Sequence, residues 1–168
     1  VTRDGVIGWS IDGLLSKYST IPSDSILTTL SDAKPEYTLL YSIGLGVEAS
    51  KYTSGRNLLI IGGGLSGIAA AFSSKNALRV SIFTEKLYSY RFLKKHGFEA
   101  YRKWSDLHGC YDLVYYSTLT PNYMNLLNNL LSKDSIVLLN PLYTRLYAIS
   151  LKVNSKYSVL IKNIDVSK

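Results

Sequence analysis

Several classes of protein are excluded by what this sequence lacks. Cys110 is the one cysteine among 168 residues, so the chain can form neither an internal disulfide nor a cysteine-rich zinc site. No apolar run approaches the ~18 residues that a membrane-spanning helix needs. The amino terminus shows no basic region followed by an apolar stretch, so we expect no secretory signal and a cytoplasmic protein without a membrane partner.

Charged residues are few and unevenly distributed. They make up 18% of the chain against 46% hydrophobic residues, a balance typical of one globular domain with a substantial core. The net charge of +7 arises mostly in the second half of the chain. Six basic residues lie close together there: Lys86, Arg91, Lys94, Lys95, Arg102 and Lys103.

This basic cluster has two interpretations. A solvated helix face explains it, and the alternative is a surface that faces the phosphates of a nucleotide or of nucleic acid. Nucleic acid is disfavoured, because the cluster lacks interleaved stacking aromatic residues on a recognisable scaffold.

Apolar runs alternate with helical segments along the chain. Residues 57–61 form a short, continuously apolar run, as expected for a buried parallel strand, and further strands are expected at 79–83, 111–116, 135–140 and 158–162. A further strand is expected at 14–21, and helices are expected at 36–52, from Leu65, at 87–96 and from Pro121. Strands that alternate with helices form βαβ units with right-handed crossovers. We therefore predict a doubly wound, mostly parallel, six-stranded α/β sheet with a short N-terminal strand and helix extension.

The motif with chemical content is a glycine cluster between the strand at 57–61 and the following helix. It reads Gly62-Gly63-Gly64-Leu65-Ser66-Gly67, a G-x-G-x-x-G pattern in the strand–turn–helix context of a dinucleotide-binding Rossmann fold. Gly62 permits the tight turn, Gly64 lets the backbone approach a pyrophosphate, and Gly67 lets helix and strand pack closely. The helix N-terminus offers N–H groups and a positive dipole end to the phosphates. The alternative is a glycine-rich turn that binds nothing.

Glu85 follows the second of these strands and is the candidate for reading the ribose. A carboxylate there accepts hydrogen bonds from the adenine ribose hydroxyls of NAD and repels the 2′-phosphate of NADP. Lys86 and Arg91 could instead stabilise that phosphate. We expect the carboxylate to decide, so that NAD is the preferred cofactor and NADP binds more weakly.

The order of features resembles the cofactor domain of the medium-chain dehydrogenase/reductases, relatives of zinc-type alcohol dehydrogenase. Residues 12–22 are similar to G-G-F-A-E-Y-V-V-V-P, residues 40–49 to the helix L-E-P-L-A-V-A-L-H-A, and residues 111–121 to F-D-V-V-I-D-A-T-G-S-P. The resemblance implies that residues 1–35 are a remnant of the catalytic domain and linker, and that residues 36–168 form the dinucleotide-binding domain. It also places Ser117 and Thr118 beside the cofactor.

Departures from the family's pattern bear on its chemistry. Two zinc ligands of the family come from a domain without a counterpart here, and the third falls at Tyr41, a poor zinc ligand, so we expect no zinc. We interpret His96 and His108 as surface residues. Tyr116 and Leu119 replace an Asp and a Gly of the family, and their bulk could narrow the nicotinamide half of the cleft.

Three functional interpretations stay open. The first is the NAD(P)-binding domain of an alcohol dehydrogenase-like oxidoreductase, truncated or degenerate, whose activity needs a catalytic domain absent from this chain. The second is a regulatory or interaction module that binds a nucleotide or nothing. The third is a flavin protein, because residues 62–72 and 80–86 also resemble an FAD fingerprint, and it is the least favoured. In each case the strand at 158–162 could pair with its copy in a homodimer.

Overall fold

The computed structural model describes residues 34, 36, 39–141 and 158–164 of the chain. The chain divides into two units, Val1–Tyr37 and Thr38–Lys168, and every helix and strand given below belongs to the second unit. The strand expected at 14–21, and with it nearly all of the catalytic-domain remnant expected at 1–35, lies outside the described residues.

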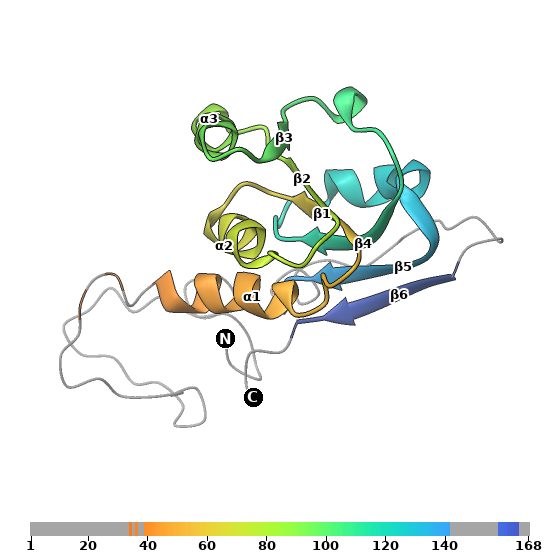
Figure 1. The fold of residues 1–168 in the computed structure, drawn as a ribbon, viewed down its shortest axis with the longest axis horizontal. Coiled ribbons are helices and arrows are strands. Elements are labelled where there is room, and N and C mark those ends of the chain that lie inside the picture. Colours follow the sequence, from red (N-terminus) through yellow and green to blue (C-terminus); the bar gives the residue numbers. More distant parts are fainter. Residues whose placement is uncertain (1–33, 35, 37–38, 142–157, 165–168) are drawn as a thin grey trace, which may run out of the picture. The chain divides into compact units, whose positions relative to one another are not determined.

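Six strands form one sheet in the order β3-β2-β1-β4-β5-β6 (Figure 1). Their bounds are β1 Asn57–Ile61, β2 Arg79–Phe83, β3 Glu99–Tyr101, β4 Tyr111–Tyr116, β5 Leu131–Leu139 and β6 Ser158–Asn163. All neighbouring strands run parallel, and the order reverses between β1 and β4, as in a Rossmann sheet. The predicted α/β fold is therefore confirmed.

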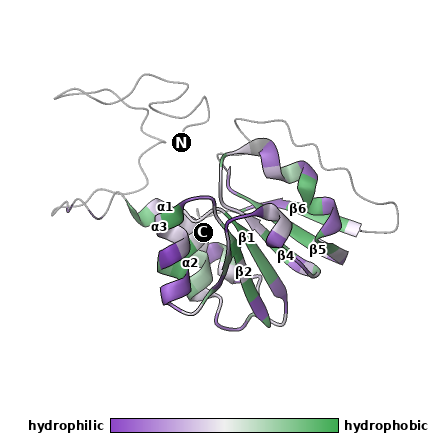
Figure 2. Ribbon diagram, turned by 90° about the horizontal axis from the view of Figure 1, so that it is seen from above, coloured by the Kyte–Doolittle hydropathy of each residue, from purple (hydrophilic) through white to green (hydrophobic). Residues whose placement is uncertain are grey.

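Both faces of the sheet are covered, so the central strands β1 and β4 are buried over nearly their whole length. Leu58 and Ile60 of β1 belong to one buried cluster, whereas Leu59 and Ile61 belong to another. The first face carries α1 (Leu40–Ser50), α2 (Leu65–Ser73) and α3 (Leu87–Lys95), and the second carries the 3₁₀ helices η3 (Trp104–Asp106) and η4 (Pro121–Asn129). Figure 2 shows β1 as hydrophobic along most of its length.

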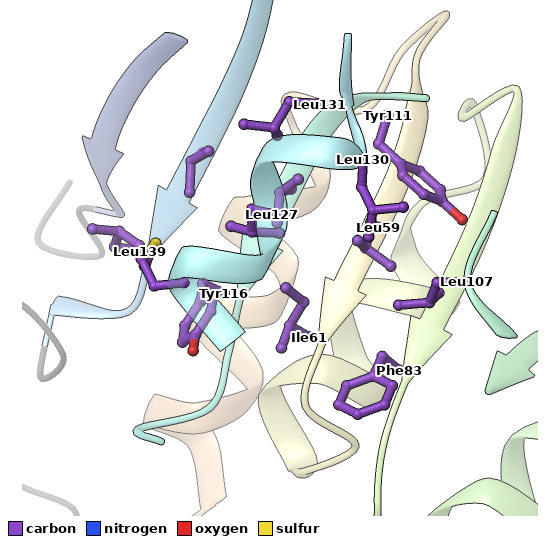
Figure 3. Packing of buried hydrophobic residues seen from close by; sticks show 13 residues of the cluster. Leu59, Ile61, Phe83, Leu107, Tyr111, Tyr116, Leu127, Leu130, Leu131 and Leu139 are labelled. Atoms are coloured by element: carbon purple, nitrogen blue, oxygen red, sulfur yellow. The ribbon is translucent and has the colours of Figure 1, made fainter. Parts of the chain in front are cut away.

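The helix expected from Pro121 is a 3₁₀ helix. Its side chains Met124 and Leu127, followed by Leu130 just after it, are buried at three-residue intervals, which is the repeat of a 3₁₀ helix. Figure 3 shows Leu127 and Leu130 packed over Leu59 of β1. Four asparagines in the nine-residue segment are weak α-helix formers.

Other elements differ from expectation at places where side chains are polar. β3 was not predicted, because its three residues include Glu99 and show no apolar run. β5 begins at Leu131 rather than at 135, and the exposed Lys133 and Asp134 interrupt its hydrophobic pattern. The described α1 lies within the helix expected at 36–52.

A polar network holds β3 against β2. The Glu99 carboxylate accepts hydrogen bonds from Arg79, from Tyr101 and, at 2.7 Å, from the Ser81 hydroxyl. Hydrogen bonding from Arg79 is the main reason that the pKa of Glu99 falls from 4.5 to about 2. The stabilisation is therefore complete above pH 4.5 and is lost as the pH falls toward 2.

We expect Glu99→Gln to flatten the dependence of stability on pH in this acid range. In the unmodified protein, the free energy of unfolding should fall between pH 4.5 and 2, in part because Glu99 binds a proton on unfolding. The variant has no proton to bind at this position. Urea denaturation at a series of pH values measures the difference. Parallel curves for the two proteins would contradict the expectation.

α1 and α2 pack closely because a glycine lies where they meet. A Cβ on Gly46 would stand 2.3 Å from the carbonyl oxygen of Ser66 and 2.7 Å from the backbone nitrogen of Ala70. A Cβ on Gly44, in the same helix, would have no atom within 4 Å. Gly46 is therefore required by packing, and Gly44 is not.

This difference gives a matched pair of variants. Gly46→Ala should lower the free energy of unfolding by about 2 kcal/mol, because backbone atoms of α2 must move to admit the methyl group. Gly44→Ala should be neutral or stabilise by up to about 1 kcal/mol, because alanine favours the helix. Chemical denaturation of both variants measures these changes. Equal effects of the two substitutions would show that the helices do not pack at Gly46.

Candidate functional site

The carboxyl ends of β1, β2 and β4 lie level with one another. Ile61 is opposite Phe83 of β2 and Tyr116 of β4. In open α/β sheets, ligands bind at the carboxyl ends of the strands where the strand order reverses, here between β1 and β4. A cavity of about 250 Å³ lies at this edge. Its walls are formed by Ile61, Gly62, Gly63, Gly64, Phe83, Thr84, Glu85, Lys86, Ser117, Thr118, Thr120 and Tyr123.

Most of the residues proposed from the sequence meet in this cavity. Those that line it are Gly62, Gly63, Gly64, Glu85, Lys86, Ser117 and Thr118. Leu65, Ser66 and Gly67 do not line it, and they form the first turn of α2 instead. Contact of any of these residues with a cofactor stays a prediction.

Three glycines of the motif are required by the protein's own packing. Gly62 has a φ of 116°, in the region that favours glycine, and a Cβ there would stand 2.6 Å from Ser117 Oγ. A Cβ on Gly67 would stand 2.0 Å from the carbonyl oxygen of Gly62, and one on Gly63 would stand 2.5 Å from Thr84 Oγ1. The turn is thus enclosed by α2 and by the ends of β2 and β4.

Gly64 differs from the other three glycines. It is exposed, its φ of −77° and ψ of 179° suit any residue, and no atom lies within 4 Å of where its Cβ would be. Neither backbone strain nor internal packing therefore calls for glycine here. The space beside its backbone is open.

The N-terminus of α2, next to Gly64, has the features of an anion site. The first hydrogen bond of the helix runs from the Ile68 nitrogen to the Gly64 oxygen at 2.9 Å, so the preceding N–H groups have no partner within the helix. No side chain caps this end, and no acidic residue stands in the first turn. The free N–H groups and the positive end of the helix dipole therefore suit a phosphate.

The segment after β2 carries the second polar group of the cavity. Glu85 is exposed, and its backbone oxygen accepts a hydrogen bond from Arg102 at 3.4 Å. The buried Thr84 accepts a hydrogen bond at its Oγ1 from the Lys86 backbone nitrogen at 3.3 Å. These two bonds fix the backbone on either side of the Glu85 carboxylate.

Ser117 and Thr118 connect the end of β4 to the glycine turn. The Ser117 hydroxyl lies 3.0 Å from the carbonyl oxygens of Ile61 and Gly62, to which it donates. The Thr118 backbone nitrogen donates to Ile61 at 3.1 Å. Ser117 therefore has a structural role, which sequence reasoning had not separated from cofactor contact.

The sequence predicts that the bulk of Tyr116 and Leu119 narrows the nicotinamide half of the cleft. Tyr116 is fully buried in the core, and its hydroxyl donates to the Thr120 carbonyl oxygen at 2.5 Å. Leu119 packs against the same core. Neither residue lines the described cavity, and their effect on the nicotinamide half stays a prediction.

Sequence reasoning missed the aromatic wall of the cavity. The ring of Tyr123 stacks on the ring of Trp104, with the two centroids 5.2 Å apart. It forms a T-shaped pair with the ring of Phe83, with the centroids 4.8 Å apart. Burial, together with the neighbouring Glu85 carboxylate, raises the pKa of Tyr123 to about 12. These residues come from β2, η3 and η4, so no local pattern in the sequence joins them. Ile61, Thr84 and Thr120, which also line the cavity, were missed as well.

The described part of the chain offers no evident metal site. Among its residues, no three His, Cys, Asp or Glu side chains form a group that could hold an ion. Tyr41 lies in the first turn of α1. His96 and His108 are exposed, as expected.

None of the described helices is long and apolar enough to cross a membrane.

Comparison with known proteins gives matches in structure alone. No protein-family model matches the chain, and no curated protein matches it. Solved structures with a similar fold include an alcohol dehydrogenase from Escherichia coli complexed with NADH, at 14% identity and a TM-score of 0.66, over 96% of this chain and 53% of that one. The chain shares its fold with zinc-type alcohol dehydrogenases.

Two further structures support this likeness. Galactitol-1-phosphate dehydrogenase from Escherichia coli matches with 15% identity and a TM-score of 0.63, over 95% of this chain and 52% of that one. A protein described as a zinc-binding dehydrogenase from Sinorhizobium meliloti, bound to NADP, matches with 14% identity and a TM-score of 0.58, over 75% and 44%. The chain spans about half the length of these structures. The resemblance inferred from the sequence is confirmed at the level of the fold.

Proposed function

We propose that residues 36–168 bind a nicotinamide adenine dinucleotide in the described cavity and serve as the cofactor domain of an alcohol dehydrogenase-like oxidoreductase. Gly64 is the observation that carries the proposal, because its backbone faces open space next to the uncapped start of α2, where a pyrophosphate could approach it directly. The dehydrogenases with the same fold that are bound to NADH or NADP support it. A bound dinucleotide would supply hydride transfer, for which the rest of the active site must come from outside the described residues.

The residues of the cavity fit the two polar parts of such a ligand. The N–H groups at the start of α2 would donate to the pyrophosphate, which Gly64 leaves free to approach. Glu85 would accept hydrogen bonds from the adenine ribose hydroxyls. The described residues offer no zinc-binding group, and Tyr41 stands at the family's ligand position, so the proposed domain works without zinc of its own. Elemental analysis of the purified protein tests that point.

A non-catalytic nucleotide-binding module is the second candidate. Tyr116, at the end of β4, and Leu119, just after it, favour this candidate, because they stand where the family resembled has an Asp and a Gly. Binding without turnover by the whole protein would support this candidate over the first.

The partner that we propose besides the dinucleotide is a second copy of the chain. β6 lies at the end of the sheet order, and Leu160 and Ile161 on it are 59% and 39% exposed. Edge strands of this kind are usually paired or covered. Light scattering of the purified protein distinguishes a dimer from a monomer.

Gly64→Val should abolish dinucleotide binding and leave the fold intact. A valine side chain would fill the space that the pyrophosphate needs, whereas no protein atom lies within 4 Å of its Cβ. Calorimetric titration with NAD, NADP and FAD measures binding, and a thermal melt measures the fold. Gly67→Ala is the control, because it should lower the melting temperature through its clash with the Gly62 oxygen. A folded Gly64→Val that binds as before would make the glycine turn purely structural.

The unmodified protein should prefer NAD over NADP by about tenfold or more, which corresponds to about 1.4 kcal/mol. A 2′-phosphate would meet the Glu85 carboxylate, and like charges that lie close together repel. Lys86 and Arg91 oppose this effect, but both are exposed and can stay in solvent. Glu85→Ala should remove most of the preference, as measured by the ratio of the two dissociation constants. Equal or tighter binding of NADP by the unmodified protein would show that the basic neighbours decide.

A further inference from the structure

One residue of the aromatic wall, Tyr123, lines the cavity together with Glu85 and carries a hydroxyl. Tyr123 is stacked face to face on Trp104, with an interplanar angle of 15°, and it meets the Phe83 ring at 67°. The rings of Trp104 and Phe83 also form a T-shaped pair, with their centroids 5.1 Å apart. The ring of Tyr123 is therefore fixed by two neighbours. Its hydroxyl is the polar group that remains to interact with the cavity.

The Glu85 side chain needs such a partner to keep one position. Its backbone is held by Arg102 and by the hydrogen bond between Lys86 and Thr84, but the side chain is exposed. An exposed glutamate loses rotamer entropy when a ligand orders it. Tyr123 and Glu85 line the same cavity, and the phenol keeps its proton at neutral pH, so it can donate to the carboxylate.

We propose that Tyr123 is a positioning residue that holds the Glu85 carboxylate in place through its hydroxyl and thereby sets the choice between NAD and NADP. This inference rests on the proposed function. The carboxylate has two oxygens and about four acceptor positions. One hydrogen bond from Tyr123 occupies one acceptor position and leaves the remaining positions free for the ribose hydroxyls. Admission of a 2′-phosphate requires the carboxylate to turn away, which breaks the bond to Tyr123.

The test is a double-mutant cycle on dinucleotide binding. Dissociation constants for NAD and NADP are measured by calorimetry for the unmodified protein, Tyr123→Phe, Glu85→Gln and the double variant. Tyr123→Phe keeps the ring and its stack on Trp104, and it should lower the preference for NAD about three- to tenfold. In the Glu85→Gln background, the same change should have little further effect on the preference.

A matched control and a ligand-free measurement complete the test. Tyr88→Phe makes the same change at a 70% exposed residue of α3 and should leave both constants unchanged. Without ligand, the ring ¹³C signal of Tyr123 should titrate at a lower pH in Glu85→Gln than in the unmodified protein, because the carboxylate no longer favours the protonated phenol.

The outcomes separate this inference from the proposed function. If the unmodified protein binds NAD, but Tyr123→Phe keeps the same preference or weakens both dinucleotides equally, the positioning role is wrong and the cofactor site stands. An unchanged Tyr123 titration in Glu85→Gln also overturns the positioning role. If the unmodified protein binds neither dinucleotide, the proposed function fails and the inference fails with it.

Discussion

The close approach of Gly67 to the carbonyl oxygen of Gly62 is the constraint on which the site depends. A methyl group at Gly67 would stand 2.0 Å from that oxygen, so α2 can begin directly at the end of β1 only without it. The start of α2 then directs its free N–H groups to the edge where the strand order reverses. Ser117 completes the arrangement, since its hydroxyl reaches the turn only because Gly62 has no side chain.

The two sides of the cavity are built by different physical means. On the side of α2, backbone groups and the helix dipole supply the polar contacts, and side chains matter mainly by their absence. On the side of β2, the contacts come from side chains on three separate elements, with Phe83, Trp104 and Tyr123 packed around one another. The first side depends on the space that its glycines leave. The second depends on packing between β2, η3 and η4.

Particular residues show how far the sequence alone could be used. The strand at 57–61 and the glycine run after it were predicted as the structure has them, because buried parallel strands and tight turns are both local patterns. β3 was missed, because a polar network around Glu99 rather than an apolar run holds it. The 3₁₀ form of η4 was missed as well. The three-residue spacing of its buried side chains shows that form only once the core facing them is known.

The sequence by itself therefore determined the parallel α/β sheet, the position of the glycine turn and the placement of Glu85 after β2. Each of these follows from hydropathy period, glycine geometry or distance along the chain. The tertiary structure decided which glycines of the turn serve packing and which one has open space beside it, because that depends on atoms as distant in sequence as Ser117 and Thr84. It also decided that Tyr123 shares a cavity with Glu85, since the two residues meet only where β2 and the segment after β4 end at the same edge.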